Sequence, residues 1–251
     1  MKPEYPHAGL IAGLRQLWKQ AFGDTDAFLD LFFSTGYRPD HCRCITEAGQ
    51  PVAALYWLDF YCEEQKFAYI YAVATDPACR GQGLCRQLMA DTADLLTAKG
   101  YHGAILIPQD EGLRIMYGKM GYLPATAIDE YHCAGGTPCP VREITAGEYL
   151  QLRSALLPAG SLTPADAATD LLAALARFYA GDGFVAAAGG DEAHLRFVEY
   201  LGPQEKQAAL VAALGHTEAT IRTVGNGTDF AMYLPLVSGC IKPEYYPFAF
   251  D

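Results

Sequence analysis

The residues best suited to chemistry lie in one stretch, Ala68 to Met89, which reads AYIYAVATDPACRGQGLCRQLM. The short apolar run Tyr69 to Val73 is typical of a buried strand, and Asp76-Pro77 ends it. A loop with two glycines, Arg80 to Gly83, follows. From Leu84 to Gly100 apolar residues recur at helical spacing. The stretch therefore predicts a strand, a glycine loop and a helix in that order.

A glycine loop at a helix N-terminus can bind an anion, because the first N–H groups point outward and the helix dipole favours negative charge. The loop lacks the G-x-G-x-x-G spacing of dinucleotide folds, since Arg86 stands three residues after Gly83. It also lacks the Gly-Lys-Ser/Thr ending of nucleoside triphosphate loops. The alternative is a tight turn that needs glycine and binds nothing.

The segment Arg80-x-x-Gly83-x-Cys85 resembles the acetyl-CoA motif R/Q-x-x-G-x-G/A of the GCN5-related N-acetyltransferase (GNAT) superfamily. Cys85 departs from the usual Gly or Ala, and we expect little steric consequence because cysteine is small. The resemblance implies that acetyl-CoA pyrophosphate binds the backbone N–H groups of Gly81, Gln82, Gly83, Leu84 and Cys85, with Arg80 and Arg86 adding positive charge. It also implies that pantetheine amides pair with the strand edge of Val73, Ala74 and Thr75.

A second resemblance lies in Tyr117-Gly-Lys-Met-Gly121-Tyr122, which is similar to the family's Y-x-x-x-G-F/Y segment. In the family this tyrosine is the general acid beside the CoA sulfur. Amine attack on a thioester releases a thiolate, which a phenol of pKa about 10 can protonate. The alternative is that Tyr117 is only a core residue, since the chain has 16 tyrosines.

The general base is not identified by any motif, because no acidic residue lies between Tyr69 and Thr75. Four carboxylates stand at predicted strand ends, and we interpret each as a solvated surface group: Asp59, Glu63, Asp110 and Glu111. In the resembled family a C-terminal carboxylate can reach the active site. Asp251 is therefore a further candidate.

The elements that must position these residues follow from apolar periodicity and turn signals. The pattern predicts helices over 8–22, 24–36, 83–99 and 112–120, and strands over 41–47, 51–63, 66–75, 103–107 and 122–131. The first three strands are expected to form an antiparallel meander, and the fourth to run parallel to the third across the helix between them. This order resembles the GNAT fold, an α/β (α+β) fold in which helices flank a mixed, mostly antiparallel sheet.

A linker rich in glycine and proline, residues 134–140, predicts two domains, 1–135 and 136–251. The second half predicts helices after Thr145, over 163–181 and over 203–215, and strands over 184–188, 194–201, 220–224 and 229–237. Only Gly202 separates the second of these strands from Pro203, which is too little backbone to wrap a pyrophosphate. We interpret this half as a degenerate GNAT-like domain with a structural or acceptor-binding role. The tandem arrangement resembles acetyltransferases of the enhanced intracellular survival type.

Composition narrows the partners of this 251-residue chain. Its net charge of −11 argues against nucleic acid, which a basic face would bind. No apolar span is long enough to cross a membrane, and we expect a cytoplasmic protein. The eight cysteines lack metal-binding spacing and are expected to be reduced, small hydrophobic residues, so no metal is predicted. The oligomeric state stays open.

Together these patterns predict an acetyl-CoA-dependent N-acetyltransferase whose acceptor is a primary amine of a small molecule or peptide. A CoA-binding sensor or structural module without transferase activity is the alternative, because no base is identified and the second half is degenerate.

Overall fold

The computed structural model describes residues 2–189 and 194–250. The chain divides into two compact units that interleave along the sequence. The first contains the residues up to Leu123 with Thr163–Leu171 and Met232–Lys242, and the second contains Pro124–Leu162, Leu172–Ala231 and the segment from Pro243 onward. The boundary between residues 135 and 136 stays a prediction, because units defined by contacts need not coincide with domains that fold alone.

Two helices precede the sheet of the first unit, as their apolar spacing predicts. α1 (Ile11–Phe22) ends at Gly23, whose φ of 76° is the left-handed conformation that favours glycine. α2 (Asp26–Thr35) begins after Thr25, whose hydroxyl accepts a hydrogen bond from the Phe28 N–H at 3.2 Å. Both predicted helices are confirmed.

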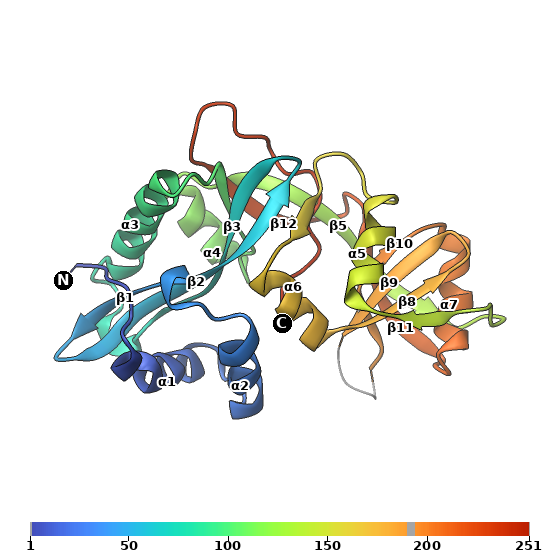
Figure 1. Ribbon diagram of the computed structural model, residues 1–251, viewed down its shortest axis with the longest axis horizontal. Coiled ribbons are helices and arrows are strands. Elements are labelled where there is room, and N and C mark those ends of the chain that lie inside the picture. The colour runs from blue at the N-terminus through green and yellow to red at the C-terminus, as the bar shows by residue number, and fades with distance from the viewer. Residues whose placement is uncertain (1, 190–193, 251) are drawn as a thin grey trace. The chain divides into compact units, whose positions relative to one another are not determined.

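The sheet of the first unit begins with the predicted antiparallel meander. Its strands are β1 (Cys42–Glu47), β2 (Gln50–Cys62) and β3 (Gln65–Thr75). α3 (Leu84–Ala98) then crosses to β4 (Gly103–Leu106), which runs parallel to β3. Figure 1 shows α3 on one face of this sheet and α1 and α2 on the other. The structure therefore confirms the predicted meander, the helix that follows it and the parallel fourth strand.

The strand that completes this sheet comes from an unexpected part of the chain. After α4 (Glu111–Gly118), the strand predicted over 122–131 forms as β5 (Leu123–Ala134). It pairs antiparallel with β11 (Glu218–Val224) in the second unit, whereas β4 pairs antiparallel with β12 (Thr228–Pro235). In the strand order β12 therefore lies between β4 and β5, because an alternating pattern indicates a strand but does not identify its partner.

The second unit repeats the order of the first. Three antiparallel strands, β8 (Arg177–Gly181), β9 (Phe184–Gly189) and β10 (Arg196–Leu201), lead through α7 (Gln207–Ala213) to β11, which is parallel to β10. At the edge, β6 (Arg142–Ile144) pairs with β8, and α5 (Ala146–Ser154) follows. Thr145 caps α5 by accepting a hydrogen bond from Glu148 N at 3.2 Å. The predicted repeat of the fold is confirmed.

One predicted helix of the second half is wrong. Residues 163–181 contain three elements: β7 (Leu162–Pro164), which pairs with β2, α6 (Ala167–Leu175), and β8. Pro164 lies at the end of a short strand, and the N–H of the next residue, Ala165, donates to the Asp59 carbonyl at 3.0 Å. Apolar residues continue through Ala176, so the sequence pattern did not show that the helix ends at Leu175 and a strand begins at Arg177.

Buried side chains cover both faces of the first sheet. On the α3 face the core includes Trp57, Leu88 and Tyr117. On the other face Trp18 packs against Phe32 and Tyr56, with ring centroids 4.6 and 5.0 Å away. No helix in the described ranges is long and apolar enough to span a membrane.

The eight cysteines all carry free thiols. Four of them, Cys42, Cys44, Cys62 and Cys79, are buried, and Cys85, Cys133, Cys139 and Cys240 are half-buried. Their packing agrees with the interpretation of small hydrophobic side chains.

Candidate functional site

The central feature of the site is an opening between β3 and β4. The two strands pair at Phe67, Ala68 and Tyr69, and in the described part of the chain this pairing stops at Tyr69 opposite Ile105. Of the following residues of β3, Ile70, Tyr71, Ala74 and Thr75 keep β2 as their partner on the other edge. In the described residues β3 has no pairing with β4 beyond Tyr69, and such an edge suits an extended ligand.

A bulge in β3 marks the middle of the opening. Tyr71 lies opposite Tyr56 and Ala74 opposite Ala54, so that Ala72 and Val73 together oppose a single residue of β2. Ala72 has a φ of 48°, which is unusual for a residue with a side chain. Tyr71, Ala72 and Val73 are half-buried, whereas residues 67–70 are buried. The bulge bends β3 at the point where its residues become partly exposed.

The glycine loop continues from the end of β3. Arg80 donates from Nε to the Thr75 carbonyl at 3.3 Å, which ties the loop to the strand. Gly81 and Gly83 have φ angles of 77° and 79°, and a Cβ atom on either would meet nothing within 4 Å. Backbone conformation, and not lack of space, therefore requires glycine at both positions. Gln82 lies between them and is exposed.

α3 begins directly after this loop without a capping side chain. Gly83 is its N-cap residue and supplies no side-chain acceptor to the first turn. Leu84 is buried, Cys85 is half-buried and Arg86 is exposed. No side chain caps the N–H groups of this first turn, and an anion could bind them; the predicted anion site stays a prediction.

Tyr117 belongs to the core that lines the other side of the loop. α4 begins after Asp110, which accepts a hydrogen bond from Leu113 N at 2.8 Å, and places Tyr117 in the core with Leu84. Only 6% of Tyr117 is exposed, and burial raises the pKa of its phenol, with the nearby Cys85 thiol raising it further. The phenol is therefore protonated at neutral pH.

The sequence model of the acetyltransferase (GNAT) domain family matches residues 7–125. Residues 7–125 are a GNAT acetyltransferase domain. This range holds the opening in the sheet, the glycine loop and Tyr117. No curated protein matches the chain in a sequence comparison.

Solved structures extend the likeness to nearly the whole chain. A GCN5-related N-acetyltransferase from Kribbella flavida has a TM-score of 0.73 at 15% identity, covering 94% of this chain and 72% of its own. One from Anabaena variabilis ATCC 29413 has a TM-score of 0.72 at 16% identity, covering 94% and 73%. Eis1 from Mycobacterium abscessus has a TM-score of 0.68 at 11% identity, covering 94% and 74%. At these identities the likeness shows a common fold.

The carboxylates near the GNAT domain's strand ends differ in environment. Asp59 is 4% exposed, accepts a hydrogen bond from the Tyr101 hydroxyl at 2.6 Å and pairs with Lys66 at 2.6 Å. Its interpretation as a solvated surface group is therefore wrong, because both oxygens are engaged in a buried cluster. Glu63 and Glu111 are exposed, as predicted.

The last residues pack irregularly in the second unit. Tyr245, Tyr246, Phe248 and Phe250 are buried, and an isolated bridge joins Tyr245 to Ser161. The Pro247 carbonyl accepts a hydrogen bond from Arg222 at 2.6 Å. Asp251, a predicted base, lies outside the described residues.

A buried ion pair of the second unit was not anticipated from the sequence. Arg153 and Glu199 are both fully buried and are joined by two hydrogen bonds of 2.7 and 2.9 Å, and the Tyr149 hydroxyl also donates to Glu199. Arg153 further donates to the Leu162 carbonyl at 3.1 Å. In the sequence, the pair is visible only as one charged residue, Arg153 or Glu199, within each of two otherwise apolar stretches. The pair links α5 to β10 and holds no reactive group open to a ligand.

Among the residues that the structure describes in the second unit, β10 and β11 show no opening equivalent to that of the GNAT domain. Pairing of β10 with β11 continues to Tyr200 opposite Thr223, and the Thr223 hydroxyl donates to the Tyr200 carbonyl at 2.8 Å. Gly202 follows, where a Cβ atom would lie 2.4 Å from the Phe184 Cβ atom. The strands stay together where those of the GNAT domain separate.

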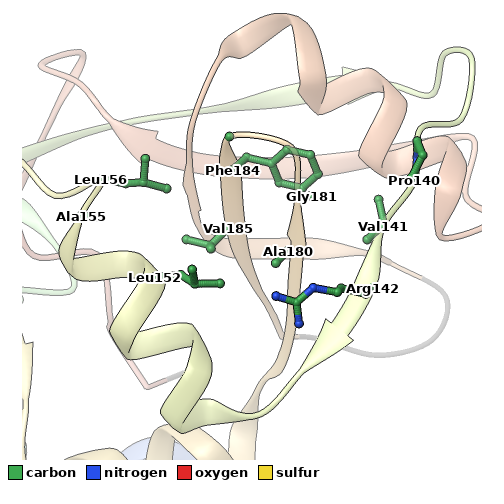
Figure 2. Close-up of a pocket in the computed structure, with 11 residues that line it drawn as sticks. Pro140, Val141, Arg142, Leu152, Ala155, Leu156, Ala180, Gly181, Phe184 and Val185 are labelled. Carbon is green, nitrogen blue, oxygen red and sulfur yellow. The ribbon is translucent and has the colours of Figure 1, made fainter.

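A cavity of about 420 Å³ lies elsewhere in the second unit, between α5 and the edge of the sheet. Figure 2 shows Leu152 and Leu156 on one side, Val141 and Arg142 on the other, and Ala180 between them. Arg142 is the one charged lining residue and already pairs with Glu148 at 2.6 Å. The cavity offers no nucleophile or proton acceptor. Among the described residues no cluster of His, Cys, Asp or Glu could hold a metal ion.

Proposed function

We propose that the protein transfers an acetyl group from acetyl-CoA to a primary amine of a small molecule or peptide. The observation that carries this proposal is the opening beside β3, which leads directly into the glycine loop and the uncapped start of α3. In thioester transfer by direct attack, this strand edge and helix start would bind the donor, and the buried phenol would supply a proton to the leaving sulfur.

In this proposal the main chain holds the donor. The edge formed by Val73, Ala74 and Thr75 pairs with the pantetheine amides, because an extended amide chain hydrogen-bonds to an open strand edge. N–H groups at the bulge polarise the thioester carbonyl. The pyrophosphate is bound by the N–H groups of Gly81, Gln82, Gly83, Leu84 and Cys85, with the exposed Arg80 and Arg86 supplying positive charge.

The proposed chemistry is one addition and one elimination. The amine nitrogen attacks the thioester carbonyl carbon, a C–N bond forms, and the C–S bond breaks with its electron pair remaining on sulfur. Tyr117 donates its hydroxyl proton to that sulfur and regains a proton from solvent, while the proton leaving nitrogen passes to a base or to water. Burial keeps the Tyr117 phenol protonated but also makes it a weaker acid, so proton transfer to sulfur depends on the position of its hydroxyl beside the leaving thiolate.

An assay of thioester cleavage over a panel of primary amines tests the proposal. Tyr117→Phe is expected to lower kcat by about a hundredfold or more while leaving acetyl-CoA affinity unchanged, because only proton transfer is lost. Tyr122→Phe is a matched control, since it removes a hydroxyl from a ring whose centroid is 5.8 Å from that of Tyr117. Equal activity of Tyr117→Phe and wild type would contradict the role of Tyr117.

The proposed general base is the Asp251 carboxylate. Deletion of the last two residues is expected to reduce turnover and to leave acetyl-CoA binding intact. The measurement is kcat together with a thermal shift on adding acetyl-CoA. Unchanged turnover would remove Asp251 from the mechanism.

A CoA-binding sensor without transferase activity is the second candidate. It is favoured by the state of the predicted carboxylates, since Asp59 is engaged in a buried cluster and Asp110 caps a helix. Acetyl-CoA binding with no cleavage in the presence of any amine would support this candidate over the enzyme.

A further inference from the structure

The cavity of the second unit has an apolar floor. Its volume of about 420 Å³ falls within the range of about 300–1,000 Å³ that is typical of small-molecule sites. Ala180, Phe184 and Val185 line it and are buried. Gly181 and Gly183 of the same hairpin line it without adding a side chain. The floor therefore favours the apolar part of a ligand.

The walls of the cavity are also apolar, and they reach the surface. Leu152 and Val141 are half-buried and lie on opposite sides in Figure 2. Leu156, just beyond the end of α5, keeps 38% of its surface exposed. A single exposed leucine is ordinary, but this one adjoins other apolar side chains around a cavity. A ligand that covers Leu156 and contacts Leu152 removes this surface from water, which favours binding.

One end of the cavity carries a guanidinium group. Arg142 is the first residue of β6, and its side chain reaches from the strand towards α5 (Figure 2). Its Nη2 atom lies 2.6 Å from a Glu148 carboxylate oxygen, and 58% and 39% of the two side chains are exposed. An ion pair this exposed contributes little to stability. Because a guanidinium has five N–H donors, a carboxylate in the cavity can bind Arg142 beside Glu148 or in its place.

The sign of the charge at this end favours an anion. Arg142 is the single charged side chain among the described residues that line the cavity. Asp182 lies between two lining glycines, but its side chain is 98% exposed and lies 3.8 Å from Lys206. It therefore extends into solvent. Charge complementarity with Arg142 favours a carboxylate and disfavours an ammonium.

We propose that this cavity binds a small monocarboxylate with an apolar chain. The chain packs against Leu152, Leu156 and Phe184, and the carboxylate accepts hydrogen bonds from Arg142. All the lining residues belong to the second unit, so the proposal does not depend on acetyl transfer by the GNAT domain. Binding is non-covalent and involves no reaction.

Calorimetric titration of the full chain with octanoate, octanol and octylamine tests the charge of the ligand at constant chain length. Octanoate is expected to bind about tenfold more tightly than octanol or better, because a hydrogen bond between charged groups replaces a weaker one. Octylamine is expected to bind more weakly than octanol. Equal affinity of octanoate and octanol would overturn the assignment of a carboxylate, and absence of octanoate binding would overturn the site.

Two exposed side chains provide variants with opposite expected effects. Arg142→Gln is expected to weaken octanoate binding about tenfold and to leave octanol binding unchanged. Glu148→Gln removes the competing carboxylate and is expected to tighten octanoate binding about two- to fivefold. Arg177→Gln is the matched control, since Arg177 is an exposed arginine of β8 outside the cavity lining. Equal losses in Arg142→Gln and Arg177→Gln would overturn the role of Arg142.

A variant that fills the cavity tests where the chain of the ligand binds. Ala155 is an exposed lining residue, so Ala155→Trp places an indole at the cavity without changing the buried core. This variant is expected to weaken octanoate and octanol binding alike, by about tenfold or more, because the indole occupies the apolar surface that the chain needs. Unchanged affinity for both ligands would place them outside this cavity and overturn the proposal.

Discussion

At the scale of single residues, burial decides what the polar groups of the first unit can do. Asp59 shows this most clearly, because its oxygens are engaged by Tyr101 and Lys66 below the surface. Its sequence neighbours gave no sign of this, since Tyr101 lies 42 positions away in the chain. Tyr117 could be identified from the sequence through its spacing from Gly121, whereas the environment that sets its pKa depends on Cys85 and distant core residues.

His41 belongs to the same buried cluster as Asp59. Its ring is stacked on Trp57 with centroids 5.0 Å apart, and its Nδ1 lies 3.9 Å from an Asp59 oxygen. Burial lowers the pKa of His41 below its ordinary value of 6.5, with Lys66 and Lys99 lowering it further and Asp59 and Asp40 opposing the shift. The neutral imidazole is therefore the form that the folded state accommodates.

The depressed pKa of His41 predicts a pH dependence of stability. Because the pKa is lower in the folded state, protonation favours unfolding: the contribution of neutral His41 is fully present above about pH 6.5 and is lost as pH falls below it. We expect Tm to fall more steeply between about pH 7 and about pH 5 in wild type than in His41→Gln. Thermal unfolding at a series of pH values measures both slopes. Parallel slopes would show that His41 does not titrate between the two states.

At the scale of elements, local patterns predicted most of what positions the site. The meander, α3 and the parallel β4 follow from apolar periodicity with clear turn residues between them. Two features that local patterns did not predict have one physical origin. The pairing of β5 with β11 and the strand at 162–164 are set by contacts between distant segments, which local propensity does not encode. The opening beside β3 likewise depends on where pairing with β4 stops.

The glycine loop predicts an effect of backbone conformation on ligand binding. Gly83→Ala is expected to weaken acetyl-CoA binding about tenfold, because a φ of 79° costs a residue with a side chain about 1–2 kcal/mol and the loop shifts to relieve it. Calorimetric titration measures the change in Kd. Gly49→Ala is the matched control, with a φ of 78°, the same open surroundings and a position in the turn between β1 and β2. Equal affinity of the two variants for acetyl-CoA would contradict the role of the loop.

At the scale of the whole molecule, two units with the same strand order differ at one turn. In the GNAT domain β3 and β4 separate and a loop with two left-handed glycines enters α3. In the second unit β10 and β11 stay paired as far as Thr223, and Pro203 follows Gly202 without a loop. The sequence already distinguished the two turns by their length and glycine content, although the extent of strand pairing became visible only in the structure.

This difference makes the number of acetyl-CoA sites the most direct test of the account. Calorimetric titration of the full chain with acetyl-CoA is expected to give one site per chain, abolished or weakened in Gly83→Ala and unaffected by substitutions in the second unit such as Thr223→Val, which removes a hydrogen bond at the equivalent turn. Two sites per chain, or binding that survives Gly83→Ala unchanged and responds to Thr223→Val, would contradict the assignment of the opening beside β3 as the acetyl-CoA site.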